Sequence, residues 1–242
     1  MEKERISKLM AQRGMCSRRE ADVYLERGWV LVDGETAIVG EKALPTQDIT
    51  LLQSGQQEQS TRVTILIHKP IGIVSSQAED GYQPAVSLIS RQTQSASDKS
   101  GLRFARNHLN GLAVAGRLDI DSTGLLVLTQ DGRIARTLIG DQSVVEKEYL
   151  VRVDGQLSDH DLKRLNHGLS LDGRALKPAQ VAWQNQNQLK FILKEGRKRQ
   201  IRRMCEMVGL RVVGLKRVRI GRIALADLEP GCWRYLRADE SF

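Results

Sequence analysis

Short apolar stripes punctuated by glycine dominate the first part of the chain. The apolar positions within 6–10 follow helical spacing, and Gly14 after them is a natural helix stop. Residues 17–20 spell Ser-Arg-Arg-Glu, the Ser-x-x-Glu form of a capping box, and an apolar stripe continues over 21–25. The pattern therefore predicts two short helices.

A small sheet is predicted after these helices. Residues 29–32 (Trp-Val-Leu-Val) are β-prone, and Asp33-Gly34 is a favourable hairpin turn. A further short strand is expected at 49–52. We therefore expect residues 1–52 to form one compact unit, with two helices followed by a small sheet.

The rest of the chain predicts a larger mixed α/β unit. Residues 53–62 have almost no apolar content and are predicted to be a flexible linker that lets the two domains adjust their spacing. Strands are predicted at 63–68, 125–128, 149–153, 211–213 and 218–223, and helices at 134–139 and 201–208. The polar segment 91–110 is expected to be a mobile surface excursion. The predicted organisation is thus two domains, 1–52 and 63–242, joined by 53–62.

Positive charge is concentrated near the C-terminal end of the larger unit. The chain carries a net charge of +8, which makes a polyanion the first partner to consider. Ten cations lie between Gly196 and Arg222 against a single acid, Glu206. Within this stretch Arg217 and Arg219 are two positions apart and would share one face of a strand. A solvated basic face without a ligand is the alternative, but the mutual repulsion of ten cations favours a phosphate-bearing partner.

The pair Arg18-Arg19 has a separate significance. Both residues occupy the first turn of a predicted helix, where positive side chains oppose the helix dipole. A helix N-terminus is itself an anion site, so the pair is expected to meet phosphates there. Two solvent-exposed arginines without a ligand are the alternative.

Several classes of protein are not indicated by the composition. No apolar run approaches the ~20 residues that span a bilayer. The charged N-terminus lacks the apolar stretch of a secretory signal. The three cysteines and four histidines are scattered, which fits neither a disulfide framework nor a zinc site. We expect a soluble cytoplasmic protein that has no membrane association and uses neither metal nor cofactor.

Residues 116–126 (Gly-Arg-Leu-Asp-Ile-Asp-Ser-Thr-Gly-Leu-Leu) carry the strongest chemical signal. They place charged residues directly before a buried apolar strand. Carboxylates are rare at the edge of a core unless they are paired or functional. Local chemistry alone leaves three interpretations of Asp119 and Asp121 open: a metal pair, a hydrogen-bonded turn or a catalytic acid.

Four motifs in order resemble those of the RsuA family of pseudouridine synthases. Residues 116–126 resemble its catalytic motif, 69–72 (Lys-Pro-Ile-Gly) its first motif, 146–149 (Glu-Lys-Glu-Tyr) its tyrosine motif and 196–204 (GRKRQIRRM) its basic motif. Residues 4–52 resemble the S4 RNA-binding domain that this family typically carries. The resemblance covers nearly the whole chain, apart from the linker and the 91–110 excursion.

The resemblance implies an α+β fold. A small S4-like αα-β RNA-binding domain would precede a synthase domain with a mixed, largely antiparallel sheet flanked by helices and crossed by a basic cleft. It also implies that the chain isomerises a uridine in RNA to pseudouridine without a metal or cofactor.

The resemblance further assigns Asp119 as the nucleophile, Tyr149 as the residue that stacks on the flipped base, and Arg202 as the partner of the aspartate. An ionised carboxylate can trap the sugar after the glycosidic bond breaks or initiate loss of the C2′ proton, and the sequence leaves both routes open. The Tyr149 hydroxyl could help to remove the C5 proton. Asp121 is expected to cap or brace the loop.

RNA is the expected partner, bound by basic side chains of both domains. The predicted RNA-binding residues are Lys8, Arg18, Arg19, Lys69, Arg117, Lys147, Arg199, Arg203, Arg217 and Arg219. The runs at 16–22, 146–151 and 199–206 look closest to the RluF-like type. That similarity implies one uridine of large-subunit (23S) ribosomal RNA, with a similarly shaped tRNA stem-loop as a further candidate, and we expect the protein to act as a monomer.

The sequence leaves other functions to consider. The same reaction on small-subunit ribosomal RNA, and a non-catalytic S4-type RNA-binding protein, are the main alternatives. An aspartate-dependent nucleotide hydrolase would usually need a cluster of metal-binding acids or a glycine-rich phosphate loop, and neither is evident in the sequence.

Overall fold

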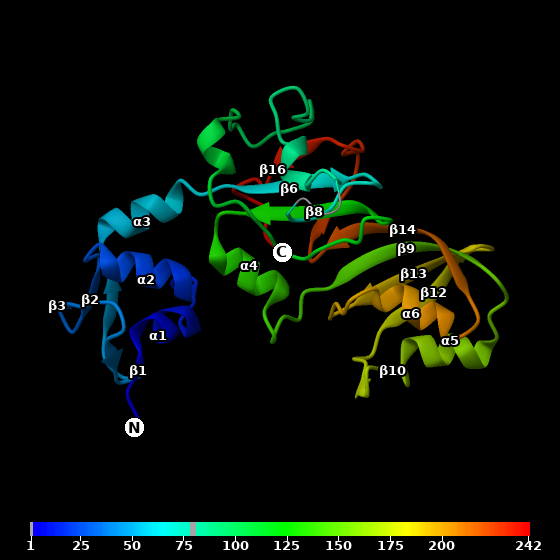
Figure 1. The fold of residues 1–242 in the computed structure, drawn as a ribbon, viewed down its shortest axis with the longest axis horizontal. Coiled ribbons are helices and arrows are strands. Elements are labelled where there is room, and N and C mark those ends of the chain that lie inside the picture. Colours follow the sequence, from blue (N-terminus) through cyan, green and yellow to red (C-terminus); the bar gives the residue numbers. More distant parts are fainter. Residues whose placement is uncertain (1, 78–80) are drawn as a thin grey trace.

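The computed structural model describes residues 2–77 and 81–242. Figure 1 shows two groups of elements, an N-terminal unit at the left and a larger body built on a long twisted sheet, with helix α3 between them. None of the helices in the described ranges is both long and apolar enough to cross a membrane.

The N-terminal unit contains the two predicted helices and short strands. Its elements are β1 (Glu4–Arg5), α1 (Ile6–Gln12), α2 (Arg18–Glu26), β2 (Val30–Val32), β3 (Glu35–Thr36), β4 (Lys42–Ala43) and β5 (Ile49–Leu51). Strand β2 lies between β3 and β5, and β1 pairs with β4. The apolar stripes of both helices pack on this sheet, so the unit has a hydrophobic core of its own around Ile6, Met10, Tyr24 and Val30.

Two local predictions in this unit are confirmed. The Ser17 side chain accepts from the backbone N–H of Glu20, whose carboxylate accepts from the backbone N–H of Ser17, so the capping box is complete. Asp33 and Gly34 both have positive φ, at 50° and 89°, as a tight two-residue hairpin between β2 and β3 requires.

The segment predicted to be a flexible linker is a helix, so this prediction is wrong. Helix α3 spans Gln53–Ser60. Its sequence lacks an apolar stripe, but glutamine, serine and glutamate are tolerated in helices, and its two ends are anchored to the N-terminal unit. Gly55 is buried against Leu51, and Gln59 Nε2 donates to the carbonyl of Met15 at 2.8 Å.

The larger body is built on a nine-stranded sheet. Its main path follows the order β12-β13-β9-β14-β8-β6-β16, with β7 added beside β8 and β15 beside β14. The bounds are β6 (Thr64–Lys69), β7 (Ala113–Val114), β8 (Thr123–Thr129), β9 (Lys147–Asp154), β12 (Gln180–Asn185), β13 (Gln188–Leu193), β14 (Arg211–Ile220), β15 (Ile223–Ala224) and β16 (Trp233–Tyr235). Within the described ranges all neighbouring strands are antiparallel except β14 and β8. The predicted mixed, largely antiparallel sheet is confirmed, with 211–213 and 218–220 joined in one strand.

Helices cover the sheet as its apolar residues require. They are α4 (Gly132–Ile139), α5 (Asp159–Asn166) and α6 (Gln200–Glu206), together with the 3-10 turns η1 (Ala85–Leu88) and η2 (Arg106–Leu109) and the hairpin β10 (Ser170–Leu171) and β11 (Arg174–Ala175). Leu165 of α5 and Met204 of α6 share a core with β9 and β13, and Figure 1 shows both helices below that half of the sheet. Leu138 of α4 packs under β8 in a separate core.

The contacts of the 91–110 excursion do not fit a mobile loop. The backbone N–H of Ser95 donates to the carbonyl of Trp233 at 2.7 Å, and the ring of Phe104 packs edge-on against Trp233. His108 Nδ1 lies 2.6 Å from the Tyr235 hydroxyl. Strand β16 therefore holds the excursion at three points along its length.

A bulge in β14 separates two arginines that were predicted to share a face. Arg217 is opposite Tyr149 on β9, whereas Arg219 is opposite Glu148, and the register shifts between the two arginines. Adjacent residues on a strand point to opposite faces, so the bulge turns Arg217 and Arg219 away from each other. Arg217 is buried, and Arg219 forms ion pairs with Glu148 and Glu146.

We expect Gly124→Ala to destabilise the protein severely. Gly124 faces Arg217 at the parallel pairing, its φ is +113°, and a Cβ would lie 2.2 Å from the Arg217 carbonyl oxygen. Gly168 is a matched control, because its φ is +119° and a Cβ there meets nothing within 4 Å. Gly168→Ala should cost about 1–3 kcal/mol of unfolding free energy from backbone strain alone. Gly124→Ala should cost more than about 4 kcal/mol in urea denaturation, and equal losses would contradict the steric argument.

Candidate active site

Asp119 lies in the loop that joins β7 to β8, and its neighbours fix this loop. Leu118 is buried, and Ser75 Oγ both donates to the Leu118 carbonyl (2.6 Å) and accepts from the Leu118 N–H (2.8 Å). The Asp119 carbonyl accepts from the N–H of Ser122 at 3.1 Å, which closes a turn. The Asp119 side chain remains 35% exposed, so a ligand can reach it. Ser75 was missed by the sequence analysis, because a serine after a proline–glycine turn carries no distinctive signal.

The Lys-Pro-Ile-Gly segment braces the other side of the same loop. The N–H of Gly72 donates to the carbonyl of Ile120 at 3.0 Å, and Thr123 Oγ1 donates to the carbonyl of Lys69 at 2.7 Å. The Lys69 side chain is completely buried, and its Nζ donates to two carbonyls of its own turn, at 2.8 and 2.9 Å. The prediction that Lys69 contacts RNA does not fit this burial, since the segment supports the loop from within.

The charge of Lys69 is balanced by the nearby carboxylates. Burial lowers the pKa of Lys69 to about 8, while the charges of Asp119 and Asp121 act in the opposite direction. The ammonium therefore lies within electrostatic reach of both aspartates. A buried lysine behind a reactive carboxylate adds positive charge to the site without occupying its surface.

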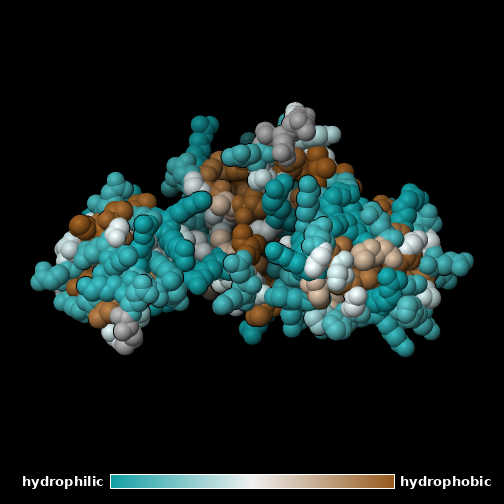
Figure 2. Space-filling model, turned by 60° about the horizontal axis from the view of Figure 1, so that its bottom comes forward, coloured by the Kyte–Doolittle hydropathy of each residue, from teal (hydrophilic) through white to brown (hydrophobic). Residues whose placement is uncertain are grey.

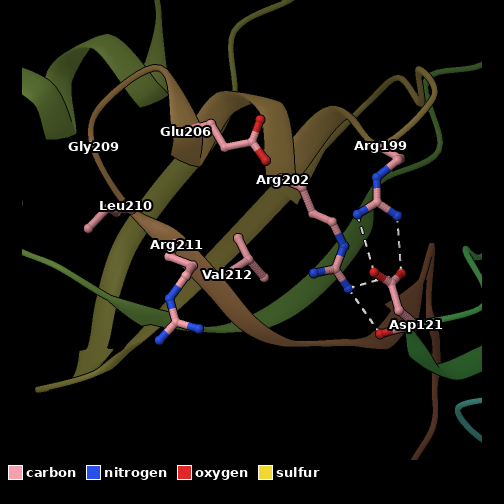
Figure 3. Close-up of a pocket in the computed structure, with 8 residues that line it drawn as sticks. All are labelled: Asp121, Arg199, Arg202, Glu206, Gly209, Leu210, Arg211 and Val212. Carbon is pink, nitrogen blue, oxygen red and sulfur yellow. Dashed lines mark hydrogen bonds and ion pairs between the residues drawn. The ribbon is translucent and has the colours of Figure 1, made fainter.

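Arg199 and Arg202 converge on Asp121 (Figure 3). Arg202 Nη2 lies 3.1 Å from Asp121 Oδ1 and donates to the Asp121 carbonyl at 2.9 Å, and Arg199 Nη2 lies 3.2 Å from Asp121 Oδ2. Burial acts to raise the pKa of Asp121, but the hydrogen bonds and charges of the two arginines outweigh it and hold this pKa below its ordinary value.

The prediction that Arg202 is the partner of Asp119 is not met in this structure. The cation with which Asp119 forms an ion pair is Arg199, at 3.9 Å. Arg199 directly precedes α6 in a left-handed conformation (φ 51°), which places its side chain beside the loop, whereas Arg202 lies one turn further along the helix. Sequence spacing could not distinguish the two. Asp121 braces the site as predicted, by holding both guanidinium groups.

A cavity of about 470 Å³ begins at this cluster. Figure 3 shows that it lies between the start of α6 and the turn that leads into β14; its lining residues are Asp121, Arg199, Arg202, Glu206, Gly209, Leu210, Arg211 and Val212. Arg202 Nε is buried and has no hydrogen-bond partner in the described part of the chain. The Nη2 group of Arg202 is therefore occupied by Asp121, and its Nε–H donor has no partner among the described residues.

Tyr149 and Arg217 lie beside the start of the loop that carries Asp119. Tyr149 is 8% exposed, and the Arg217 guanidinium lies 6.0 Å from the centre of its ring. Arg217 Nε donates to the Leu125 carbonyl (2.7 Å) and Nη2 to the Gly116 carbonyl (2.9 Å). Arg217 thus connects the strand of Tyr149 to the start of the loop that carries Asp119.

Burial also removes two more residues from the predicted RNA-binding set. Arg217 is almost completely buried, and Lys147 points inward from β9 on the same side as Tyr149. Burial lowers the pKa of Lys147 to about 8, and the charges of Arg217 and Lys177 lower it further. Both side chains belong to the interior of the site, so the prediction that they contact RNA does not fit this structure.

Distant carboxylates neutralise much of the basic cluster. Ion pairs join Arg203 to Asp172, Arg211 to Asp154, and Arg219 to Glu146 and Glu148. All of these acids lie outside 196–222, so the charge count along the sequence overstated the excess. The interpretation of ten uncompensated cations is therefore wrong, although several of the paired arginines remain accessible to a stronger anion. Outside this cluster, Lys8 pairs with Glu4, four residues before it.

Three predicted RNA-binding residues remain exposed without an ion pair in the described residues: Arg18, Arg19 and Arg117. The first two occupy the opening turn of α2, and Arg117 lies two residues before Asp119. These positions are free to bind phosphate, with Arg117 beside Asp119 and the arginine pair on the N-terminal unit.

This geometry suits nucleophilic chemistry by a carboxylate. An accessible carboxylate on a rigid loop, next to a guanidinium that can fix its orientation, can attack or stabilise an electron-poor carbon. Within the described ranges no group of three His, Cys, Asp or Glu side chains is placed to hold a metal ion.

Comparisons with known proteins agree with this chemistry. A model of the RNA pseudouridylate synthase family matches residues 63–207. A protein of Escherichia coli O6:H1 named dual-specificity RNA pseudouridine synthase RluF is 34% identical over 240 residues, which cover 98% of this chain and 76% of that protein. The ribosomal large subunit pseudouridine synthase B of Yersinia pestis is 32% identical, over 96% of this chain and 72% of its own length.

A solved structure also matches almost the whole chain. It is a crystal structure of a pseudouridylate synthase, with a TM-score of 0.64 and 25% sequence identity, and the match covers 96% of this chain and 95% of that one. The likeness therefore includes both the N-terminal unit and the sheet body.

We expect Asp119→Asn to lower the pKa of Lys69 below about 8, because the protonated amine loses an attractive neighbour. The side-chain resonances of Lys69 in isotope-labelled protein, followed by NMR between pH 6 and 11, would measure the shift. Lys147 is the matched control, since burial, Arg217 and Lys177 lower its pKa and Asp119 does not contribute. An equal shift of both lysines, or a rise at Lys69, would contradict the assigned contact.

Proposed function

Because the chain belongs to the RNA pseudouridylate synthase family, it is an RNA pseudouridine synthase, and we propose that it acts on a uridine of large-subunit ribosomal RNA with Asp119 as nucleophile. The resemblance to the RsuA family noted from the sequence is thereby confirmed. The observation that carries the nucleophile assignment is the accessible Asp119 carboxylate, held on a loop braced by Ser75 and Gly72 and placed 3.9 Å from Arg199.

Beyond this carboxylate, the reaction requires little covalent chemistry from the protein. The N1–C1′ bond of uridine breaks, the uracil turns, C5 bonds to C1′, and the proton on C5 is lost while N1 regains one. Asp119 acts on the sugar, either by bonding to C1′ as the base leaves or by taking the C2′ proton. Its bond to C1′ would break again when C5 attacks, so the enzyme is regenerated.

Tyr149 and Arg202 support this chemistry from two sides. The exposed part of the Tyr149 ring can contact the flipped base. The Tyr149 hydroxyl can assist, together with solvent, in removing the C5 proton. Arg202 holds Asp121 and the Ser122 hydroxyl (3.3 Å), so it fixes the loop just after the nucleophile. We assign Arg202 to positioning, through this loop.

Large-subunit ribosomal RNA is the favoured substrate class. One relative is named for that subunit and others for dual specificity, so a tRNA stem-loop is a second substrate to test. Modification of small-subunit ribosomal RNA would instead change the proposed substrate. From these proposed substrates we infer a cytoplasmic enzyme. We also infer a monomer, because one chain supplies both the proposed RNA-binding unit and Asp119.

The N-terminal unit is proposed to be the S4-like RNA-binding domain, with domain boundaries at 1–52 and 63–242. It has its own core, and it exposes Arg18 and Arg19 at the start of α2, where phosphate binding is favourable. The non-catalytic alternative is not favoured, because the reactive carboxylate and its bracing are intact and the named relatives are enzymes.

We expect Asp119→Asn to reduce the single-turnover rate at least about a thousandfold while RNA affinity changes little, because the substitution keeps the shape and removes the nucleophile. Release of tritium from 5-tritiated uridine in a ribosomal RNA transcript measures the rate. Asp141→Asn, in an exposed turn after α4, is the control and should leave the rate unchanged.

The target is identified by mapping pseudouridine in ribosomal RNA and tRNA from cells that lack the protein. Complementation with the wild-type protein should restore one lost position, and complementation with Asp119→Asn should not. An unchanged map in both RNA classes, with no activity on unmodified transcripts, would overturn the proposed substrate. A lost position in small-subunit RNA would replace it.

The combined variant Arg18→Ala/Arg19→Ala should weaken RNA binding without slowing the chemical step. Removal of two phosphate contacts should reduce the slope of log affinity against log salt concentration by roughly 1.5. Affinity measured between 50 and 300 mM salt, with the single-turnover rate at saturating RNA, separates binding from chemistry. An unchanged salt slope would count against an RNA contact at the start of α2.

A further inference from the structure

A single carboxylate connects the N-terminal unit to the sheet body. Glu20, in the first turn of α2, accepts hydrogen bonds from the Arg62 guanidinium and from the backbone N–H of Gly132 (3.0 Å). The same carboxylate closes the capping box on the N–H of Ser17. Three segments far apart in the sequence therefore meet at one mostly buried side chain.

Arg62 anchors the connecting segment to the N-terminal unit. It follows α3 and directly precedes the sheet body, yet its guanidinium turns back and donates to the Tyr24 hydroxyl at 2.7 Å. It also pairs with Glu58 at 3.3 Å and lies 5.7 Å from the centre of the Tyr24 ring. The Arg62 side chain is largely buried, so the last residues before β6 have little freedom to swing.

The sheet body contributes the start of α4. Asp131 caps this helix by accepting from the N–H of Arg133 at 2.8 Å. The N–H of Gly132 is one of the donors that a helix leaves unpaired at its N-terminus, and a carboxylate is a favourable acceptor there. A Cβ on Gly132 would lie 2.4 Å from Ser17 Cβ and 2.7 Å from Glu20 Oε2, so the two helix starts touch at a position that only glycine permits.

Strand β8 ties this junction to the nucleophile. The loop of Asp119 leads into β8 at Thr123, and the strand ends two residues before Asp131. A seven-residue strand spans roughly 20 Å. Arg18 and Arg19 lie in the same helical turn as Glu20, so their position relative to Asp119 is set through Gly132 and β8.

We propose that Glu20, Arg62 and Gly132 form a rigid junction that selects the RNA by its shape. An RNA helix held at Arg18 and Arg19 is accepted only when its uridine lies at the fixed distance set by β8. This inference rests on the proposed function, and it replaces the predicted adjustable spacing of the two domains. Figure 2 shows that the N-terminal unit meets the larger body across a narrow neck, so a few contacts there determine its orientation.

The first test measures the junction without RNA. Spin labels at Gln12→Cys and His160→Cys, two exposed positions in a Cys232→Ser background, report the distance between the units. The wild-type protein should give one narrow distance distribution, and Gly132→Ala should shift or broaden it. A broad wild-type distribution would overturn the rigid junction.

A compensating substitution separates a steric effect at the junction from a general loss of stability. Ser17→Gly removes the Cβ and hydroxyl that Gly132→Ala would meet, and glycine is a tolerated helix N-cap. The double variant should recover part of the narrow distribution, because the contact with Glu20 Oε2 at 2.7 Å remains. Gly214→Ala is the control, because its Cβ meets only the Arg152 side chain, no closer than 3.7 Å. Glu20→Gln is a second variant that weakens the junction without adding bulk.

The second test measures substrate selection. Gly132→Ala should lower kcat/KM roughly tenfold for a long ribosomal RNA fragment that spans both units, because a loosened unit has a lower effective concentration at its helix. A short stem-loop that carries only the target uridine should be modified at the wild-type rate. Equal effects on both RNAs, or no effect on either despite an altered distance, would overturn shape selection.

The two proposals fail in different ways. If the wild-type protein modified neither RNA, the proposed substrate would be wrong, and the distance measurement would still decide whether the junction is rigid. The affinities of the wild-type protein and of Gly132→Ala would then be compared for the long fragment and for the short stem-loop. A larger loss of affinity for the long fragment would show that the junction selects among RNAs.

Discussion

The rest of the site depends on the interactions of the buried Arg217 guanidinium. It donates to the carbonyls of Leu125 and Gly116 and lies against Tyr149, so one side chain joins β14, β8, the loop of the nucleophile and β9. A buried charge is tolerated only when its donors are satisfied, and two backbone carbonyls and an aromatic ring supply that environment. The arrangement requires β14 and β8 to approach closely, which is why Gly124 faces the Arg217 backbone.

A consequence is that much positive charge lies inside the site and not on its surface. Lys69 and Arg217 are buried against the loop, and Arg199 and Arg202 close it from α6. Lys147 is buried two residues before Tyr149 on β9. Only two carboxylates of this loop, Asp119 and Asp121, oppose them. The excess favours an anionic ligand near the nucleophile even though surface arginines are largely paired with acids. Buried cations that do not contact the RNA would therefore still contribute to the electrostatic attraction of its backbone.

The sequence predicted local structure and chemistry better than it predicted the burial and pairing of individual side chains. The capping box at Ser17 and the turn at Asp33 are decided by interactions over a few residues, so local rules sufficed. The bulge between Arg217 and Arg219 is decided by pairing with β9, which lies about 70 residues away in sequence, and no local pattern encodes it. Burial of Lys69 likewise depends on the strands around it. For the same reason no local pattern indicates helix α3, since its ends are held by contacts outside it.

The two ends of strand β8 fix the positions of Asp119, the proposed nucleophile, and of the arginine pair of the N-terminal unit. Ser75 and Gly72 hold the loop before β8, and Glu20 holds the start of α4 just after it. Because a strand inside a sheet resists bending, the two ends cannot be adjusted independently, so the proposed rigid junction would require RNA to adapt to the enzyme more than the enzyme to RNA. Recognition of this kind reads the shape of a folded RNA, and base-edge contacts are needed only at the flipped uridine. That division would explain how a chain with little aromatic surface for stacking could reach the proposed specificity for one uridine.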